Sequence, residues 1–354
     1  MLSKDQTQDV GENATAVQAG KDANVQVIHN HGLSYFEVRE IALDIFKANF
    51  YELAGAAKET ARARAEEVTE AFLKKLQEEN PEGFSKSEDP DFQHGLLTVQ
   101  KEYARTGDKE LGDLLVDLLV DRSKQDKRNI LQIVLNESLS TAPKLTDEQL
   151  SALAIIFLFK YTQNFKIGNH DDLGEYFDKH VFPFAERLVK NSSCYQHLEF
   201  TGCGSIQMGE VSLEGQLSHV YQGQFLKGFD VSEIQTRGIT IGVDNRFFIP
   251  CLNDLSKVQV RANNREGLEK QFDTAQITSE DRVKILELFN LGKMPNQEIR
   301  QFCINLRPYM KNVFDVWADS PMKSFTLTSV GIAIGHANIK RLIGDFSDLS
   351  IWIN

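Results

Sequence analysis

The pattern of hydrophobic and polar positions divides the chain into three stretches. Between residues 13 and 28, small and β-branched residues alternate with polar ones around Gly20-Lys21-Asp22, which is typical of two strands joined by a turn. From residue 34 to about residue 190, apolar residues recur at helical spacing. Beyond residue 191, glycines separate short apolar runs, which favours strands and loops mixed with helices.

The N-terminal ribbon needs a partner surface, because an isolated two-stranded ribbon is only marginally stable in water. It can pack on the body of its own chain or on copies of itself in neighbouring subunits, where every strand edge would be covered. We favour the second arrangement. The residues expected to make the contacts between subunits are Val17, Ala19, Val25, Val27 and Ile28.

A helical pattern follows the ribbon. Ser34 is a good N-cap, and Glu37 occupies the capping-box position. The periodicity continues to Asn80-Pro81, which permits one helix of roughly 45 residues, about 70 Å long, while a break near Gly55 fits equally well. A long helix behind a self-pairing ribbon resembles the stalk of an oligomer; a helix lying across its own domain is the alternative.

Further helices are expected to complete an all-α bundle. Their predicted ranges are 92–105, 109–124, 129–139, 146–160 and an aromatic stretch at 171–190. Thr146 with Gln149 forms a second capping box. The most apolar segment, 150–159, is too short to cross a bilayer, which takes about twenty residues, so it is expected to be a buried helix.

The C-terminal part is expected to be α+β. Strands or loops are predicted at 198–204, 238–243 and 246–250, and helices at 279–291 and 296–317, the second kinked at Pro308. The last residues indicate a strand, a helix and a final strand, 349–353, buried in a sheet. The predicted fold is therefore α+β but mainly α, with a ribbon at 1–32, a helical domain at 33–190 and a smaller, winged-helix-like α+β domain at 191–354.

Composition narrows the function. The 39 Lys and Arg against 51 Asp and Glu give a formal net charge of -12, which disfavours membranes and makes nucleic acid an unfavoured partner. The N-terminus lacks an apolar run for a secretory signal, so a cytoplasmic location is expected. The cysteines are expected to be reduced core thiols: Cys194, Cys203, Cys251 and Cys303. No phosphate-binding, dinucleotide or hydrolase motif is present, so no cofactor and no catalytic residue is predicted.

Two clusters are weak candidates for metal binding. His29 and His31 lie two residues apart, although a polar junction between ribbon and helix is the simpler account. His170, Asp171 and His180 belong to a group of acids and imidazoles that a metal-dependent hydrolase could use, but solvated helix ends explain them equally simply. We therefore assign no metal.

One basic stretch stands out in the acidic chain. Its residues, which could contact an anion or a nucleic acid, are Lys257, Arg261, Arg265 and Lys270. An exposed loop between a strand and a helix is the favoured account. The segment 325–334 is similar to a strand-to-helix element of winged-helix modules, which leaves a DNA-binding regulator as an alternative.

The segment from Asn13 to Val25, the following Gly32-Leu33-Ser34-Tyr35 and the closing segments 327–331 and 349–353 resemble an uncharacterised bacterial family known by locus names. The leading segment alone is similar to a Gln-Ala-Gly-x-Asp-x-Asn-Val ribbon found ahead of bacterial conflict and effector proteins. This resemblance implies a role in phage defence or stress response and supplies no catalytic residues.

Together these observations favour a homo-oligomeric, cytoplasmic, non-enzymatic protein that recognises a protein or a small ligand. A DNA-binding regulator and a metal-dependent hydrolase are the alternatives.

Overall fold

The computed structural model describes residues 33–49, 55–344 and 346–354. The predicted ribbon lies outside the described residues, and so do its expected contact residues and the two neighbouring histidines: Val17, Ala19, Val25, Val27, Ile28, His29 and His31.

The described residues form a fold that is α+β but mainly α, which confirms the predicted class. The first helices are α1 (Tyr35–Asn49), α2 (Ala56–Glu79), α3 (Pro90–Thr106), α4 (Lys109–Ser123), α5 (Ile130–Thr141), α6 (Asp147–Tyr161), α7 (His170–Tyr176) and α8 (Phe182–Ala185). The later helices are α9 (Ser192–Phe200), α10 (Leu213–Val220), α11 (Ser232–Thr236), α12 (Arg265–Ala275), α13 (Ser279–Asn290), α14 (Asn296–Leu306), α15 (Met310–Asp319) and α16 (Ser329–Ile343). The strands are β1 (Gly204–Ile206), β2 (Phe248–Pro250), β3 (Val258–Val260) and β4 (Phe325–Leu327).

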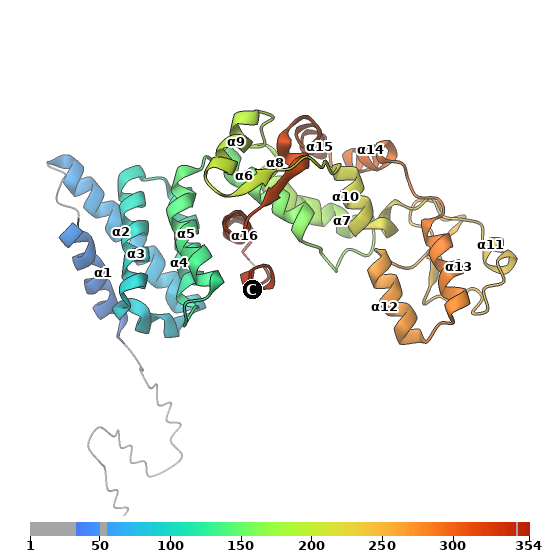
Figure 1. The fold of residues 1–354 in the computed structure, drawn as a ribbon, viewed down its shortest axis with the longest axis horizontal. Helices are drawn as coiled ribbons and strands as arrows, with labels where there is room; N and C mark the ends of the chain where they lie inside the picture. The colour runs from blue at the N-terminus through green and yellow to red at the C-terminus, as the bar shows by residue number, and fades with distance from the viewer. Residues whose placement is uncertain (1–32, 50–54, 345) are drawn as a thin grey trace, which may run out of the picture.

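The molecule is elongated (Figure 1), with α1 to α5 at one end, α11 to α13 at the other, and α6 and α16 between them. The strands form two separate antiparallel pairs, β1 with β4 and β2 with β3. In the first pair Gly204 lies opposite Leu327, and in the second Phe248 lies opposite Val260. These short strand pairs pack against neighbouring helices and do not form a separate sheet layer.

Of the two arrangements left open for residues 34–80, one long helix or a break near Gly55, the structure has the second. Ser34 and Glu37 form the expected cap, with Glu37 Oε2 accepting a hydrogen bond from the Ser34 amide at 2.7 Å. The break comes at Gly55, whose φ of 59° is in the left-handed region that favours glycine. Both helices pack against α3 as well as against each other.

The predicted bundle helices are present from α3 to α6. The second capping box is formed as expected, with Gln149 Oε1 accepting from the Thr146 amide at 3.0 Å and Thr146 Oγ1 accepting from the Gln149 amide at 3.4 Å. Helix α6 is buried continuously from Gln149 to Phe159, which confirms the buried helix expected there. No helix in the described part of the chain is both long and apolar enough to cross a bilayer.

Helix α16 packs across α6 and also contacts α4 and α5. A Cβ atom on Gly335 would lie 3.0 Å from the Leu153 carbonyl oxygen, so glycine allows the backbones of α16 and α6 to approach closely. One hydrophobic core therefore includes residues from both sides of the boundary predicted at residue 190. A second, smaller core occupies the other end, between Leu226 and Phe289, under α12 and α13.

A cluster of charged side chains joins α16 to the helical bundle. Lys340 Nζ lies 3.1 Å from Asp121 on α4 and 2.7 Å from Glu79 on α2. Asp117 is 1% exposed and is paired with Lys75 at 2.5 Å. Burial raises the pKa of Asp117, whereas for Lys340 burial alone would lower the pKa and the surrounding carboxylates raise it above its usual value.

Three predictions for the C-terminal part are corrected. The stretch predicted as strand or loop at 198–204 is partly helical, because α9 continues to Phe200. Pro308 separates α14 from α15 instead of kinking one helix, since it has no amide hydrogen to continue the helical ladder. The strand predicted at 349–353 is not formed: residues 349–351 form a 3₁₀ turn, and Leu349 and Ile353 are buried in the main hydrophobic core.

We predict that Lys340→Met destabilises the protein by roughly 2–3 kcal/mol. Removing one partner of a buried ion pair leaves a buried charge uncompensated, and the remaining cations, Lys75 and Lys124, soften that loss. Urea unfolding followed by circular dichroism measures it. Lys74→Met, an exposed lysine on α2, is the matched control, and an equal loss in both variants would show that the cluster contributes nothing.

Candidate functional site

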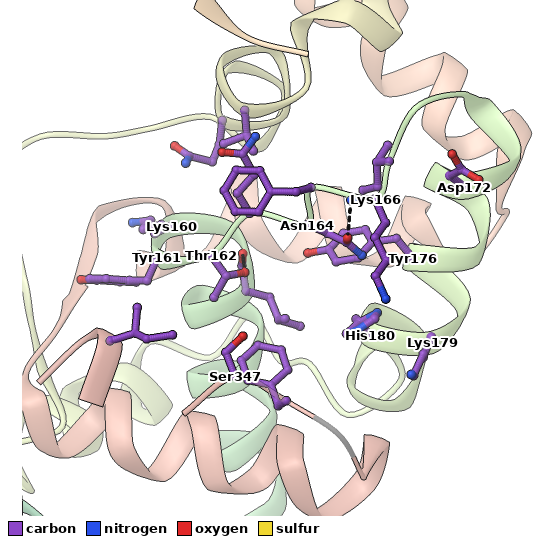
Figure 2. A pocket seen from close by; sticks show the side chains of 18 of the residues that line it. Lys160, Tyr161, Thr162, Asn164, Lys166, Asp172, Tyr176, Lys179, His180 and Ser347 are labelled. Atoms are coloured by element: carbon purple, nitrogen blue, oxygen red, sulfur yellow. Dashed lines mark hydrogen bonds between the residues drawn. The ribbon is translucent and has the colours of Figure 1, made fainter. Parts of the chain in front are cut away.

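A cavity lies where the end of α6 meets α7, α10 and the last residues of the chain (Figure 2). Its volume is about 940 Å³, within the range of sites for small organic ligands. Lysines, amides and rings are among its lining side chains. The lining side chains used below are Lys160, Tyr161, Gln163, Lys166, Asp172, Glu175, Tyr176, Lys179, His180, Gln216, Phe346, Ser347 and Trp352.

One wall of the pocket is a single helical face. Asp172, Glu175, Tyr176, Lys179 and His180 follow one another at spacings of three to four residues or as direct neighbours, which places them on one side of α7 and its continuation. That continuation, Phe177–Val181, is a π-helical turn. Such wide turns are rare and are frequent at functional sites.

Two lysines in this pocket have no carboxylate partner. Lys166 and Lys179 are exposed, and neither makes an ion pair with any described residue. Two acids also line the pocket. Asp172 accepts a hydrogen bond from the Gly168 amide at 2.8 Å, whereas Glu175 is exposed and makes no ion pair with any described residue. Because both lysines keep their full donor capacity, the pocket offers cationic groups to a ligand.

Lys160 has a different role. Its Nζ donates to the carbonyl oxygens of Met322, Lys323 and Phe325 at 3.1, 3.0 and 2.9 Å. These bonds use all three ammonium donors, so the side chain links α6 to residues 322–325, which include the first residue of β4. Burial lowers the pKa of Lys160 to about 8.

Aromatic rings form a row across the pocket. The Trp352 and Phe346 rings stack with centroids 6.0 Å apart and planes at 19°. Phe346 is followed by His180 at 6.5 Å, and His180 stacks on Tyr176 at 5.1 Å and 28°. The row therefore connects the last residues of the chain with α7.

The C-terminal segment, residues 346–354, is held by specific contacts. His336 Nε2 lies 2.7 Å from the Ser347 carbonyl oxygen, which can only accept, so this nitrogen carries the proton. Trp352 Nε1 donates to the Tyr161 carbonyl oxygen at 2.8 Å, and Leu349 and Ile353 are buried in the main core. This segment supplies one wall of the pocket, so its docking and the shape of the pocket depend on each other.

The residues of the predicted acidic and imidazole cluster point in different directions. His180 lines the pocket, where burial and the charge of Lys179 lower its pKa. His170 faces away: its Nε2 lies 3.2 Å from the Gln224 carbonyl oxygen, and its ring packs on Phe302. Asp171 is exposed in the first turn of α7 and does not line the cavity.

No three His, Cys, Asp or Glu side chains in the described ranges gather closely enough to hold a metal ion.

The predicted basic stretch lies at the other end of the molecule, around β3 and α12. Lys257, Arg265 and Lys270 each pair with a carboxylate three or four residues away, at 3.4, 2.8 and 2.7 Å. Arg261 makes no ion pair with any described residue. Local carboxylates thus neutralise most of this stretch.

Sequence reasoning missed the pocket lysines and the aromatic row. The spacing of residues 172–180 held a signal, because it predicts one helical face carrying both charges and rings. The other walls come from the loop after α6 and from the C-terminal segment, which are distant in sequence and were brought together only by packing.

A protein-family model matches residues 32–353, nearly the whole chain. The description of that family says only that its members are '-like' proteins and names no activity. No curated protein and no solved structure matches the chain.

We predict that the protein loses stability as the pH falls below about 6.5, partly through His336. Burial lowers the pKa of His336 below the usual histidine value of 6.5, with Asp121 and Asp348 acting against this shift and Lys340 adding to it. The unfolded chain therefore binds more protons in this window, so acid favours unfolding.

Urea unfolding at pH 7.5 and pH 5.5 tests this prediction. His336→Gln keeps a donor for the Ser347 carbonyl oxygen but does not titrate, so it should lose less stability between the two values than the unsubstituted protein. His94→Gln, at an exposed histidine of α3, is the control. An unchanged loss in His336→Gln would refute the assignment.

Proposed function

The chain belongs to the uncharacterised family whose model matches residues 32–353, and we propose that this member is a cytoplasmic, homo-oligomeric binding protein rather than an enzyme. Its ligand is a small anion held in the pocket between α6, α7 and the C-terminal segment. The observation that carries the proposal is the pair of lysines, Lys166 and Lys179, which line that pocket without a carboxylate partner.

The surrounding charge supports a local role for these lysines. A chain of net charge -12 repels anions at long range, so an anionic ligand needs cationic groups that neighbouring acids have not neutralised. Elsewhere, Lys257, Arg265 and Lys270 are paired with carboxylates. Lys166 and Lys179 remain available at a cavity of suitable size.

The state of the candidate nucleophiles supports binding over catalysis. Burial raises the pKa of the Cys194 thiol to about 11, which keeps it protonated at neutral pH, and Cys203 is buried with a raised pKa as well. Lys160, whose pKa burial lowers to about 8, is held by three carbonyl oxygens. None of these groups is poised to attack a ligand in the pocket.

We predict that pyrophosphate and citrate bind the full-length protein and raise its melting temperature, and that added salt weakens this binding because it screens the lysines. The double variant Lys166→Gln/Lys179→Gln should bind at least tenfold more weakly, since each charge-assisted hydrogen bond contributes about 1.5–3 kcal/mol. Isothermal titration calorimetry measures the affinity.

The matched control is Lys58→Gln/Lys74→Gln, which removes two exposed lysines of α2 far from the pocket. Equal affinity of both double variants for the anions, or no binding by the unsubstituted protein, would overturn the proposed function.

The oligomeric part of the proposal rests on the predicted ribbon, whose alternating pattern calls for a partner surface. The similarity of this segment to ribbons found ahead of conflict and effector proteins suggests a role in phage defence or stress response.

We predict that light scattering gives a mass that is a multiple of 40.0 kDa for the full chain and a single-chain mass after deletion of residues 7–32. The same multiple for both proteins would refute the assembly role of the ribbon.

A further inference from the structure

The pocket has two chemically different sides. Figure 2 shows Lys166, Lys179 and His180 on one side of the cavity and Tyr161 on the other, with Ser347 below. Trp352 belongs to the side of Tyr161, because its indole donates to the Tyr161 carbonyl oxygen. A simple inorganic anion would use the cationic side and leave the rest of a cavity of about 940 Å³ without a role.

The aromatic row offers a surface on which a flat group can stack. Phe346 lies in the middle of the row, between Trp352 at 6.0 Å and His180 at 6.5 Å, and all three side chains line the cavity while remaining partly exposed. A planar ring placed against Phe346 would gain stacking and bury apolar surface that now faces the cavity. Its substituents would then point towards the lysines.

Two amide side chains add hydrogen-bonding capacity. Gln163 and Gln216 line the cavity, and neither side chain makes a hydrogen bond to a described residue. A carboxamide presents a donor and an acceptor together, which matches the edge of a nitrogen heterocycle as in the pairing of Gln or Asn with adenine. Saturated or purely aliphatic anions would leave these groups unused.

We infer that the ligand of this pocket is a nucleotide: a heteroaromatic base stacked on Phe346 and read by the amides, with its phosphate bound by Lys166 and Lys179. This inference rests on the proposed function and narrows it. Lys160 is excluded from phosphate binding, because its three donors are already taken by carbonyl oxygens.

The chain carries its own reporter for base stacking. It has two tryptophans. Trp317 is 1% exposed and donates to the Val211 carbonyl oxygen, whereas Trp352 lines the cavity. A base bound beside Trp352 should change the tryptophan fluorescence of the full-length protein, and this change should be absent in Trp352→Phe even where binding persists.

The test titrates the full-length protein with the 5′-monophosphates of adenosine, guanosine, cytidine and uridine, and with ribose 5-phosphate and pyrophosphate. Calorimetry and tryptophan fluorescence are read in parallel. At least one nucleotide should bind tenfold or more tightly than ribose 5-phosphate, the gain expected from one base stacked on an aromatic side chain.

Two variants should separate the two ends of the ligand. Phe346→Leu keeps an apolar side chain but removes the ring, so it should weaken nucleotide binding about tenfold and leave pyrophosphate binding unchanged. Lys166→Gln/Lys179→Gln should weaken both. Melting temperatures within the range of the unsubstituted protein confirm that each variant is folded.

The outcomes distinguish this inference from the function on which it rests. If ribose 5-phosphate or pyrophosphate binds as tightly as every nucleotide, or if Phe346→Leu weakens all of them equally, the nucleotide inference fails and the anion-binding function stands. If neither nucleotides nor the simple anions bind, both fail.

Discussion

The packing of α16 against α6, α4 and α5 is the constraint on which the rest of the described fold depends. Helix α16 lies between the bundle and the middle of the molecule (Figure 1), and its close approach to α6 requires the absence of a side chain at Gly335. Lys340 then anchors the helix to carboxylates of α2 and α4. Apolar burial supplies the driving force, while the charge cluster fixes how the helix is seated, because Asp117 and its neighbours need a cation nearby.

The position of α16 also determines the pocket. The chain leaves this helix at Gly344, and the C-terminal segment is then held by His336 through Ser347 and by Trp352 through the Tyr161 carbonyl oxygen. Because Phe346 and Trp352 form one wall of the cavity, the pocket exists only where the last residues are docked. Burial lowers the pKa of the imidazole that holds this segment. The contacts that hold α16 and the C-terminal segment therefore also shape the pocket.

The composition of the candidate site is the basis of the proposed binding function. Lys166 and Lys179 make no ion pair with any described residue, the rings form a continuous row, and the Gln163 and Gln216 side chains make no hydrogen bond to a described residue. Burial raises the pKa of the Cys194 and Cys203 thiols, and the ammonium group of Lys160 is held by backbone carbonyl oxygens. These features belong to sites that hold a ligand by complementary charge and stacking, with selectivity set by a few polar groups.

Local signals in the sequence determined the helices and most of their ends. The caps at Ser34 and Thr146 and the buried run 150–159 were predictable, because capping and periodicity act over a few residues. A break near Gly55 was one of two arrangements that fitted the sequence equally well, and the structure has the break. The end of α9 and the final 3₁₀ turn were not predictable, because the apolar residues there also fit a strand and packing against the rest of the chain decided the outcome. At Pro308 a kink was expected, and the missing amide hydrogen ended the helix instead. The site divides in the same way. The face from Asp172 to His180 could be seen in the sequence, whereas its pairing with Lys166, Phe346 and Trp352 was decided only in the tertiary structure, when α16 brought the last residues back to α6.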